Sequence, residues 1–364
     1  MRSKMRYSLS TDPTQWNIRD RRLRVQMKYN KLEALWSSDN PSDILKFYGL
    51  VPDTETLVQF ASRRPSAEIA LHEYRMGRGG DVVTVVPTAS VSGALGRNAI
   101  SLFSPLPLIA AESRGVFFNY ARSINQAVSR ALDLGFKWIV ISNDDESGYN
   151  VANSLVAEID KHRTAGCILA SPKGGLWGGR SLPHEIVESS ITWDLLNHLL
   201  SAFRHHQLPP RRVFAPLFFH KFNVNHRLRS VHLTRTKNVP ISMDYFAHQI
   251  YEGPYHWVRS RVGPFYNVGD FCVLSRQTAI HYKFDENYIN GAEDLDLSLR
   301  MYMDGIDVRI SDFEITTLRG RSLSNNARKA ECRNLRDIYN VIYFFYKHNP
   351  GLNKVNFPPQ AFSI

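Results

Sequence analysis

The chain has 364 residues and a formal net charge of +11 at pH 7, from 45 Lys and Arg against 34 Asp and Glu. That length can bury a sizeable core, as one large domain or as two. The three cysteines lie far apart without CxxC spacing, which argues against a disulfide framework and a cysteine-built zinc site and favours a reducing compartment.

No apolar run approaches the length of a membrane span, and the basic start lacks the apolar core of a signal peptide. We therefore expect a cytoplasmic protein. The positive charge favours acidic partners such as phosphorylated substrates, anionic lipid headgroups or nucleic acid.

Residues 1–80 are predicted to form a basic, mainly helical extension. Residues 19–36 alternate basic and apolar side chains at loose helical spacing, and residues 61–77 predict a second helix that ends at a glycine. The basic face is either simply solvated or meets membrane phosphate or a partner, which leaves peripheral membrane contact open.

From residue 81 the pattern alternates between strands and helices. Strands are predicted over 81–90, 105–113, 137–142 and 166–172, and helices over 92–103, 119–134 and 151–162. This alternation predicts an α/β fold with a mostly parallel sheet and helices on both faces. Ligands bind such sheets beyond the carboxyl ends of the strands, where Asn143, Asp144 and Asp145 fall.

Residues 173–264 are expected to be loop-rich and basic. Residues 204–237 contain histidines and no acidic residue, and they form either a solvated surface or a lip that holds an anionic acceptor or a donor diphosphate. Residues 268–276 then predict another strand.

Residues 284–305 concentrate carboxylates in a turn that opens onto a helix. Apolar spacing from Leu295 and a glycine at Gly305 predict that helix. Glu293 and Asp294 fall in its first turn, where free N–H groups favour ionised carboxylates, so at least one should be a base at neutral pH. The alternative is that the pair merely caps the helix.

The last part of the chain predicts a strand over 307–318 that closes the sheet. Residues 333–352 predict a basic, aromatic helix, whose apolar side chains belong to the core or lie on a membrane surface.

The two acidic clusters suit a two-part mechanism. Asn143, Asp144 and Asp145 offer hard oxygen ligands for Mg or Mn, while Glu293 and Asp294 offer a base. A cation that neutralises a departing diphosphate, with a carboxylate that deprotonates a hydroxyl, supports group transfer from a nucleotide-activated donor.

Four segments together resemble the inverting glycosyltransferases of family 2, which have the Rossmann-like GT-A fold. They are PTAS, NQAVSRA, NDD and FDENYINGAEDLDLSLRMYMDG. The resemblance covers about residues 81–316, with 173–264 as a variable acceptor or lid region between the extension 1–80 and the C-terminal helix in 317–364. It implies hexosyltransferase-type chemistry of glycan biosynthesis, in which a sugar moves from a nucleotide-diphosphate sugar to an acceptor hydroxyl with inversion.

The resemblance also implies roles for individual residues. Asp294 would be the catalytic base with Glu293 orienting the site, and Asp145 would bind the metal with Asn143 at the first position of a DxD-like motif. The residues expected near the donor nucleotide are Thr88, Ser90, Glu112, Arg122, Asn125 and Asp144, although Arg122 could equally be a surface salt-bridge partner.

Three departures from the family pattern weaken the expected metal and nucleotide contacts. Asn143 replaces a carboxylate, Glu112 replaces the usual Asp, and no histidine follows the closing strand. Arg319 or Arg321 could neutralise the diphosphate instead.

The expected partners are a nucleotide sugar and an acceptor glycan, lipid-linked glycan or protein. A related GT-A nucleotidyltransferase is one alternative. Others are a non-catalytic GT-A-like scaffold or nucleic-acid-binding protein, favoured by the charge, and a transferase that acts on nucleic acid.

Overall fold

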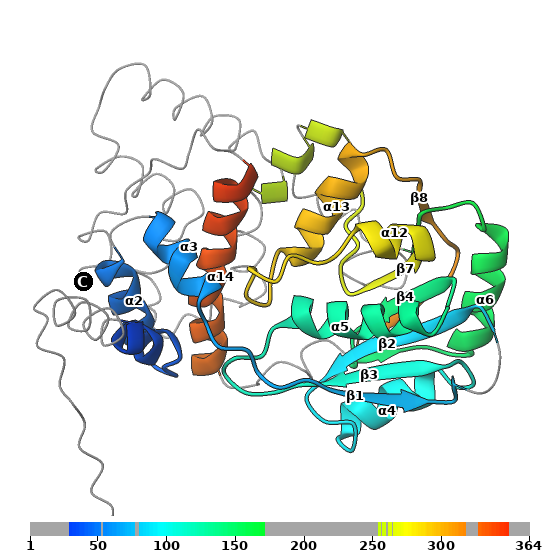
Figure 1. Ribbon diagram of the computed structural model, residues 1–364, viewed down its shortest axis with the longest axis horizontal. Helices are drawn as coiled ribbons and strands as arrows, with labels where there is room; N and C mark the ends of the chain where they lie inside the picture. The colour runs from blue at the N-terminus through cyan, green and yellow to red at the C-terminus, as the bar shows by residue number, and fades with distance from the viewer. Residues whose placement is uncertain are drawn as a thin grey trace, which may run out of the picture.

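The computed structural model describes residues 29–51, 54–76, 80–171, 254–255, 257–259, 261–263, 265–317 and 327–348. Over these residues the chain is α/β, with a mixed sheet of seven strands in the order β1-β3-β2-β4-β7-β6-β8 (Figure 1). The strands are β1 (Ala70–Tyr74), β2 (Val82–Thr88), β3 (Leu108–Glu112), β4 (Trp138–Ser142), β6 (Cys167–Leu169), β7 (Phe271–Ser275) and β8 (Val308–Ile310). A separate ladder joins β5 (Glu146–Ser147) to β9 (Thr316–Thr317).

Strand β2 has a hydrophobic core on each of its faces, and every one of its residues is buried. Val83 and Val85 pack with α5 (Tyr120–Asp133) on one face. Val82 and Val86 pack with α4 (Ala94–Leu102) and α6 (Val151–Lys161) on the other. The predicted strands and helices between residues 81 and 172 are therefore confirmed, with helices on both faces of the sheet.

The expectation of a mostly parallel sheet is wrong. β2 is parallel to β3 and β4, and β6 to β8, but β1 is antiparallel to β3 and β7 is antiparallel to both β4 and β6. A short buried apolar run has the same pattern in either direction, so the sequence could not give the direction of β7. As a consequence, the N-terminal end of β7 lies beside the carboxyl end of β4.

The helix predicted over residues 61–77 is also wrong. Helix α3 (Thr54–Ser62) ends before Pro65, and residues 70–74 form β1 at the edge of the sheet. Proline disfavours helical geometry at the residue before it, and pairing with β3 then determines the structure of the next segment. The N-terminal part of the chain thus contributes a strand to the main sheet.

Helix α13 (Glu293–Met303) lies between this sheet and a third core (Figure 1). Leu297 and Met301 pack on the α5 side of the sheet. Leu295 and Leu299 pack with the third core, which includes residues of α2 (Pro41–Leu50), α3 and α14 (Ala327–His348). The prediction that the apolar residues of the last helix belong to the core is confirmed for the side chains described in α14.

Among the described helices, none combines the length and apolar character needed to cross a bilayer. Several predictions lie outside the described residues: the basic N-terminal stretch before residue 29, the basic region 204–237, and Arg319 and Arg321.

Candidate functional site

The first turn of α13 carries the predicted base. The helix begins at Glu293 and its C-cap Asp304 is followed by Gly305 in a left-handed conformation, as predicted. Ala292 precedes the helix and provides no side-chain cap. Glu293 is buried, and Asp294 keeps limited exposure.

Burial and hydrogen bonding determine the pKa of each of these two carboxyl groups. Burial, and then the neighbouring Asp294, raise the pKa of Glu293 to about 8. Burial also raises the pKa of Asp294, but the Asn267 side chain, which donates to its Oδ2, lowers it again. Desolvation therefore outweighs the helix N-terminus for both groups, while the hydrogen bond from Asn267 favours the ionised form of Asp294.

A network of hydrogen-bonded polar side chains holds the Asp294 side chain in place. Asn267 Nδ2, which donates to Asp294, lies 2.9 Å from Tyr255 Oη, and Ser298 Oγ donates to Asn267 Oδ1 at 2.7 Å. The sequence analysis missed Asn267, Ser298 and Tyr255, because no local motif marks residues that meet only across the fold. The network leaves Asp294 with a fixed orientation.

The second acidic group follows β4. Thr88 Oγ1 at the end of β2 donates to Asp144 Oδ2 at 2.7 Å, so the structure brings these two predicted residues together. Asp144 and Asp145 are both buried, and burial is the main cause that raises the pKa of Asp144.

Glu146 continues this acidic group into β5. Neither of its carboxylate oxygens has a hydrogen-bond partner among the described residues. Burial raises its pKa to about 10, with further contributions from Asp270, Asp145 and Asp144, so Glu146 is protonated at neutral pH.

Asp270, which the sequence analysis missed, connects the two acidic groups. It precedes β7, and Asn143 Nδ2 donates to its Oδ1 at 3.2 Å. Its charge raises the pKa of Glu146 in one group and of Tyr120 and Tyr255 beside the other. Only the antiparallel direction of β7 brings Asp270 to this edge.

Glu112 is the last residue of β3, and Ser90 lies in the loop that follows the neighbouring strand β2. Glu112 Oε2 accepts a hydrogen bond from the backbone of Val91 at 3.0 Å and lies 3.4 Å from His72 Nε2. Ser90 Oγ lies 3.1 Å from Ser92 Oγ. Glu112 therefore holds the loop that was predicted to touch the nucleotide, next to Thr88 and Asp144.

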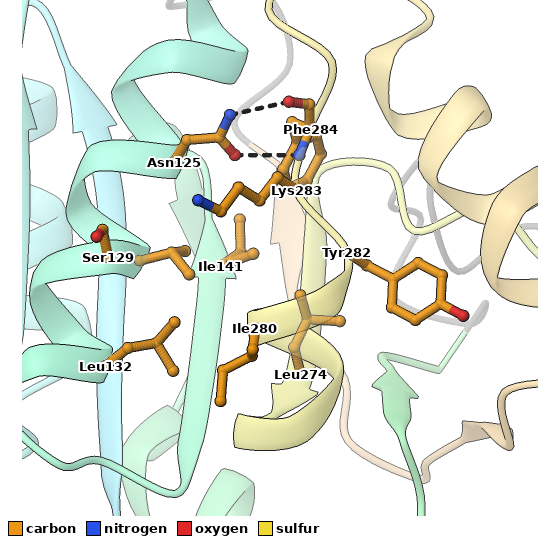
Figure 2. A pocket seen from close by; sticks show the side chains of 10 residues that line it. Asn125, Ser129, Leu132, Ile141, Leu274, Ile280, Tyr282, Lys283 and Phe284 are labelled. Carbon is orange, nitrogen blue, oxygen red and sulfur yellow. Dashed lines mark hydrogen bonds between the residues drawn. The ribbon is translucent and has the colours of Figure 1, made fainter.

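Arg122 and Asn125 contact the acidic turn instead of pointing freely at the sheet edge. Asn125 Nδ2 donates to Phe284 O at 2.8 Å and Phe284 N donates back to Asn125 Oδ1 at 3.0 Å, beside a cavity of about 150 Å³ (Figure 2). Arg122 Nε lies 2.9 Å from Glu286 Oε2, which is the salt bridge considered as its alternative role. A donor contact for either residue stays a prediction.

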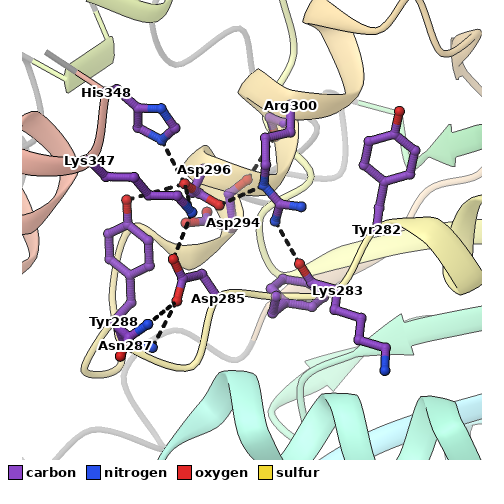
Figure 3. Close-up of polar contacts among 12 residues, drawn as sticks. Tyr282, Lys283, Asp285, Asn287, Tyr288, Asp294, Asp296, Arg300, Lys347 and His348 are labelled. Carbon is purple, nitrogen blue, oxygen red and sulfur yellow. Dashed lines mark hydrogen bonds and ion pairs between the residues drawn. The ribbon is translucent and has the colours of Figure 1, made fainter. Parts of the chain in front are cut away.

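The other carboxylates of the turn have cationic partners. Asp296 is fully buried and contacts Arg300, Lys347 and His348, and these contacts hold its pKa well below the usual range despite burial (Figure 3). Asp285 contacts Lys347 at 2.6 Å. Glu293 and Asp294 have no comparable ion pair among the described residues, which distinguishes them from carboxylates that serve stability.

A metal ion has partial support at this edge. Among the described residues, no three Asp, Glu, His or Cys side chains form a group that could hold a metal by themselves. Asp144, Asp145 and Asp270 nevertheless combine their charges close to the orphaned carboxyl of Glu146. This surplus of negative charge suits a Mg-like ion that takes one or two carboxylates and completes its shell with water and substrate phosphates.

Comparison of the chain with protein-family models finds no match, and no curated protein and no solved structure matches it significantly. The family resemblance therefore rests on the residues themselves.

Proposed function

We propose that this protein is an inverting glycosyltransferase of the GT-A type, which moves a sugar from a nucleotide-diphosphate sugar to an acceptor hydroxyl. The observation that carries the proposal is the pair Glu293 and Asp294, of which Glu293 is buried and neither has an ion pair in the described structure. Burial of charge without a partner is costly and concentrates at functional sites.

In the proposed reaction Asp294 accepts the proton of the acceptor hydroxyl. The hydroxyl oxygen forms a bond to the anomeric carbon of the donor as the bond from that carbon to the diphosphate oxygen breaks. Attack opposite the leaving group inverts the anomeric centre, and Asp294 later returns the proton to water. Glu293, protonated below its raised pKa of about 8, avoids a second negative charge beside the base.

Asp145 and Asn143 would hold the divalent cation, which neutralises the charge of the departing diphosphate when bound. Thr88 holds Asp144 through its 2.7 Å hydrogen bond, and both residues would contact the donor. The loop that follows Thr88, held by Glu112 at Val91, would approach the nucleotide.

The test is a thermal-shift panel of nucleotide sugars with Mn, Mg or EDTA on the wild type, Asp145→Ala and Asp294→Asn. We expect one nucleotide sugar to stabilise the wild type and Asp294→Asn in a metal-dependent way, and Asp145→Ala to lose this effect. If no nucleotide sugar binds while RNA or DNA binds in a salt-dependent way, the non-catalytic nucleic-acid reading replaces this proposal.

A further inference from the structure

The cavity of about 150 Å³ beside Asn125 reaches the protein surface (Figure 2). It lies between α5, α12 (Arg276–His281), the strands β4 and β7 and the chain that follows α12. Ile280 on its wall is 48% exposed, so the cavity is accessible from solvent. Cavities of this size with aliphatic and aromatic walls hold a benzene-sized group. The apolar residues of the wall are Val128, Leu132, Ile141, Leu274, Ile280 and Phe284.

Two sets of hydrogen bonds fix the distance between α5 and the chain around α12. Arg276 Nη1 donates to Leu132 O at 2.9 Å and to Phe136 O at 3.1 Å, which ties the start of α12 to the end of α5. Two turns earlier on α5, Asn125 exchanges two hydrogen bonds with the backbone of Phe284. The cavity lies between these two ties, so it is a preformed feature of the fold, as ligand sites usually are.

Lys283 places a cation at this cavity. Its side chain extends toward α5, whereas the neighbouring Tyr282 points the other way and donates to Asp304 (Figures 2 and 3). Arg300 Nη2 donates to Lys283 O at 2.6 Å and thereby holds the backbone at this point. Lys283 is exposed and has no ion pair among the described residues. Its ammonium group therefore adds an unmatched positive charge to a mainly apolar cavity.

The other polar groups at the cavity also favour an anion. Ser129 contributes an exposed hydroxyl that can donate a hydrogen bond. The amide of Asn125 is already bonded to the acidic turn, and the carboxylate of Glu286 beside it is paired with Arg122 at 2.9 Å. A carboxylate accepts strong hydrogen bonds from an ammonium group, and its single negative charge matches the single charge of Lys283.

We propose that this cavity is a binding site for a small carboxylate that carries an apolar group of about the size of a benzene ring. The carboxylate pairs with Lys283, and the apolar group lies against the wall between α5 and α12. The site shares no residue with the acidic groups around Asp145 and Asp294, and it requires neither a nucleotide sugar nor a metal. It therefore goes beyond the proposed transferase function and can be tested separately from it.

The test compares benzoate with benzamide, which has nearly the same shape and no charge, by ligand-observed NMR on the full chain. We expect benzoate to bind the wild type with a Kd of about 1 mM and benzamide to bind about threefold to tenfold more weakly. Lys283→Gln should weaken benzoate binding by the same factor and leave benzamide binding unchanged. Lys46→Gln is the matched control, because it removes an exposed lysine of α2 outside the cavity, and it should bind both probes as the wild type does.

A second variant tests the position of the probe. Ile280→Trp places a larger ring at the exposed mouth of the cavity and should abolish binding of both probes, with the thermal midpoint of the free protein changed by no more than about 2 °C. Saturating benzoate should raise the thermal midpoint of the wild type and leave that of Ile280→Trp unchanged, because a ligand stabilises only the folded state that binds it.

The proposal is overturned if benzoate does not bind the wild type at about 10 mM, if benzamide binds as tightly as benzoate, or if Lys283→Gln binds benzoate with wild-type affinity. Binding that persists in folded Ile280→Trp would place the probe elsewhere on the protein and would also reject the proposal. If Ile280→Trp does not fold, the comparison of Lys283→Gln with Lys46→Gln decides, since both replace exposed side chains.

Discussion

The ammonium group of Lys347 lies 2.7 Å from Oδ1 of Asp296 and thereby joins the last turn of α14 to the helix that carries Asp294 (Figure 3). The same ammonium contacts Asp285. Along the rest of α14, Tyr339 and Asn340 bond the backbone of the turn between these two carboxylates. Helix α14 thus positions the acidic turn as well as burying its own apolar face.

We expect Lys347→Met to destabilise the protein by about 1–3 kcal/mol, because fully buried Asp296 loses one of its partners while Arg300 and His348 remain. Urea unfolding measures this change. The control is Lys46→Met, which removes an exposed ion pair to Asp43 and should cost under about 1 kcal/mol. Equal effects of the two substitutions would show that the Lys347 contacts are no more than surface pairs.

Asp296 should make the stability of the folded protein sensitive to acid. Its pKa is lower in the folded state than in the unfolded chain, so its contribution to stability is present above about pH 4 and is lost as the pH falls below that value. Asp296→Asn should therefore be less stable than the wild type at pH 7, with the difference shrinking toward pH 2. Chemical denaturation across this range checks the prediction, and a constant difference contradicts it.

Glu293 should show the opposite linkage. Its folded pKa is raised to about 8. The stability that the protonated carboxyl provides is therefore fully present below the pKa of the group in the unfolded chain and is lost as the pH rises through about 8. Between pH 5 and pH 9, the free energy of unfolding of Glu293→Gln should rise by on the order of 1–3 kcal/mol relative to that of the wild type, because the neutral amide never ionises. Unfolding midpoints at these two pH values measure the gain; an unchanged difference would mean that Glu293 is not protonated when folded.

Asn125 should matter for stability through the turn at Phe284 (Figure 2). Asn125→Ala removes both bonds to the Phe284 backbone and one to Glu286, and we expect a loss of about 1–3 kcal/mol. Asn153→Ala, whose exposed amide bonds Asn150, should change stability by no more than about 0.5 kcal/mol. The thermal unfolding midpoints of the two variants are compared. Similar midpoints would show that the hydrogen bonds of Asn125 to the turn contribute no more to stability than an exposed amide does.

Local patterns in the sequence were sufficient for some of this architecture. The apolar period and Gly305 correctly predicted α13, and the β-branched run correctly predicted β2, because both signals are contained in one segment. The same approach failed at residues 70–74, where pairing with β3 decides the structure, and at the direction of β7, which is defined by its antiparallel pairing with β4 and β6.

The residues of the candidate site could likewise be predicted only where they stand in local sequence motifs. Thr88, Asp144, Glu293 and Asp294 stand in motifs, whereas Asp270 becomes part of the site only through the antiparallel pairing of β7. Asn267 and Tyr255 likewise acquire their roles from contacts between elements far apart in the chain.

The most direct test of the account is turnover of the nucleotide sugar that binds, compared between the wild type and Asp294→Asn, with water or a glycoside as acceptor. The account predicts that Asp294→Asn binds the donor with wild-type affinity but turns it over about 10²–10⁴-fold more slowly, as expected for loss of a general base. Wild-type turnover by Asp294→Asn would contradict the assignment of Asp294 as the base.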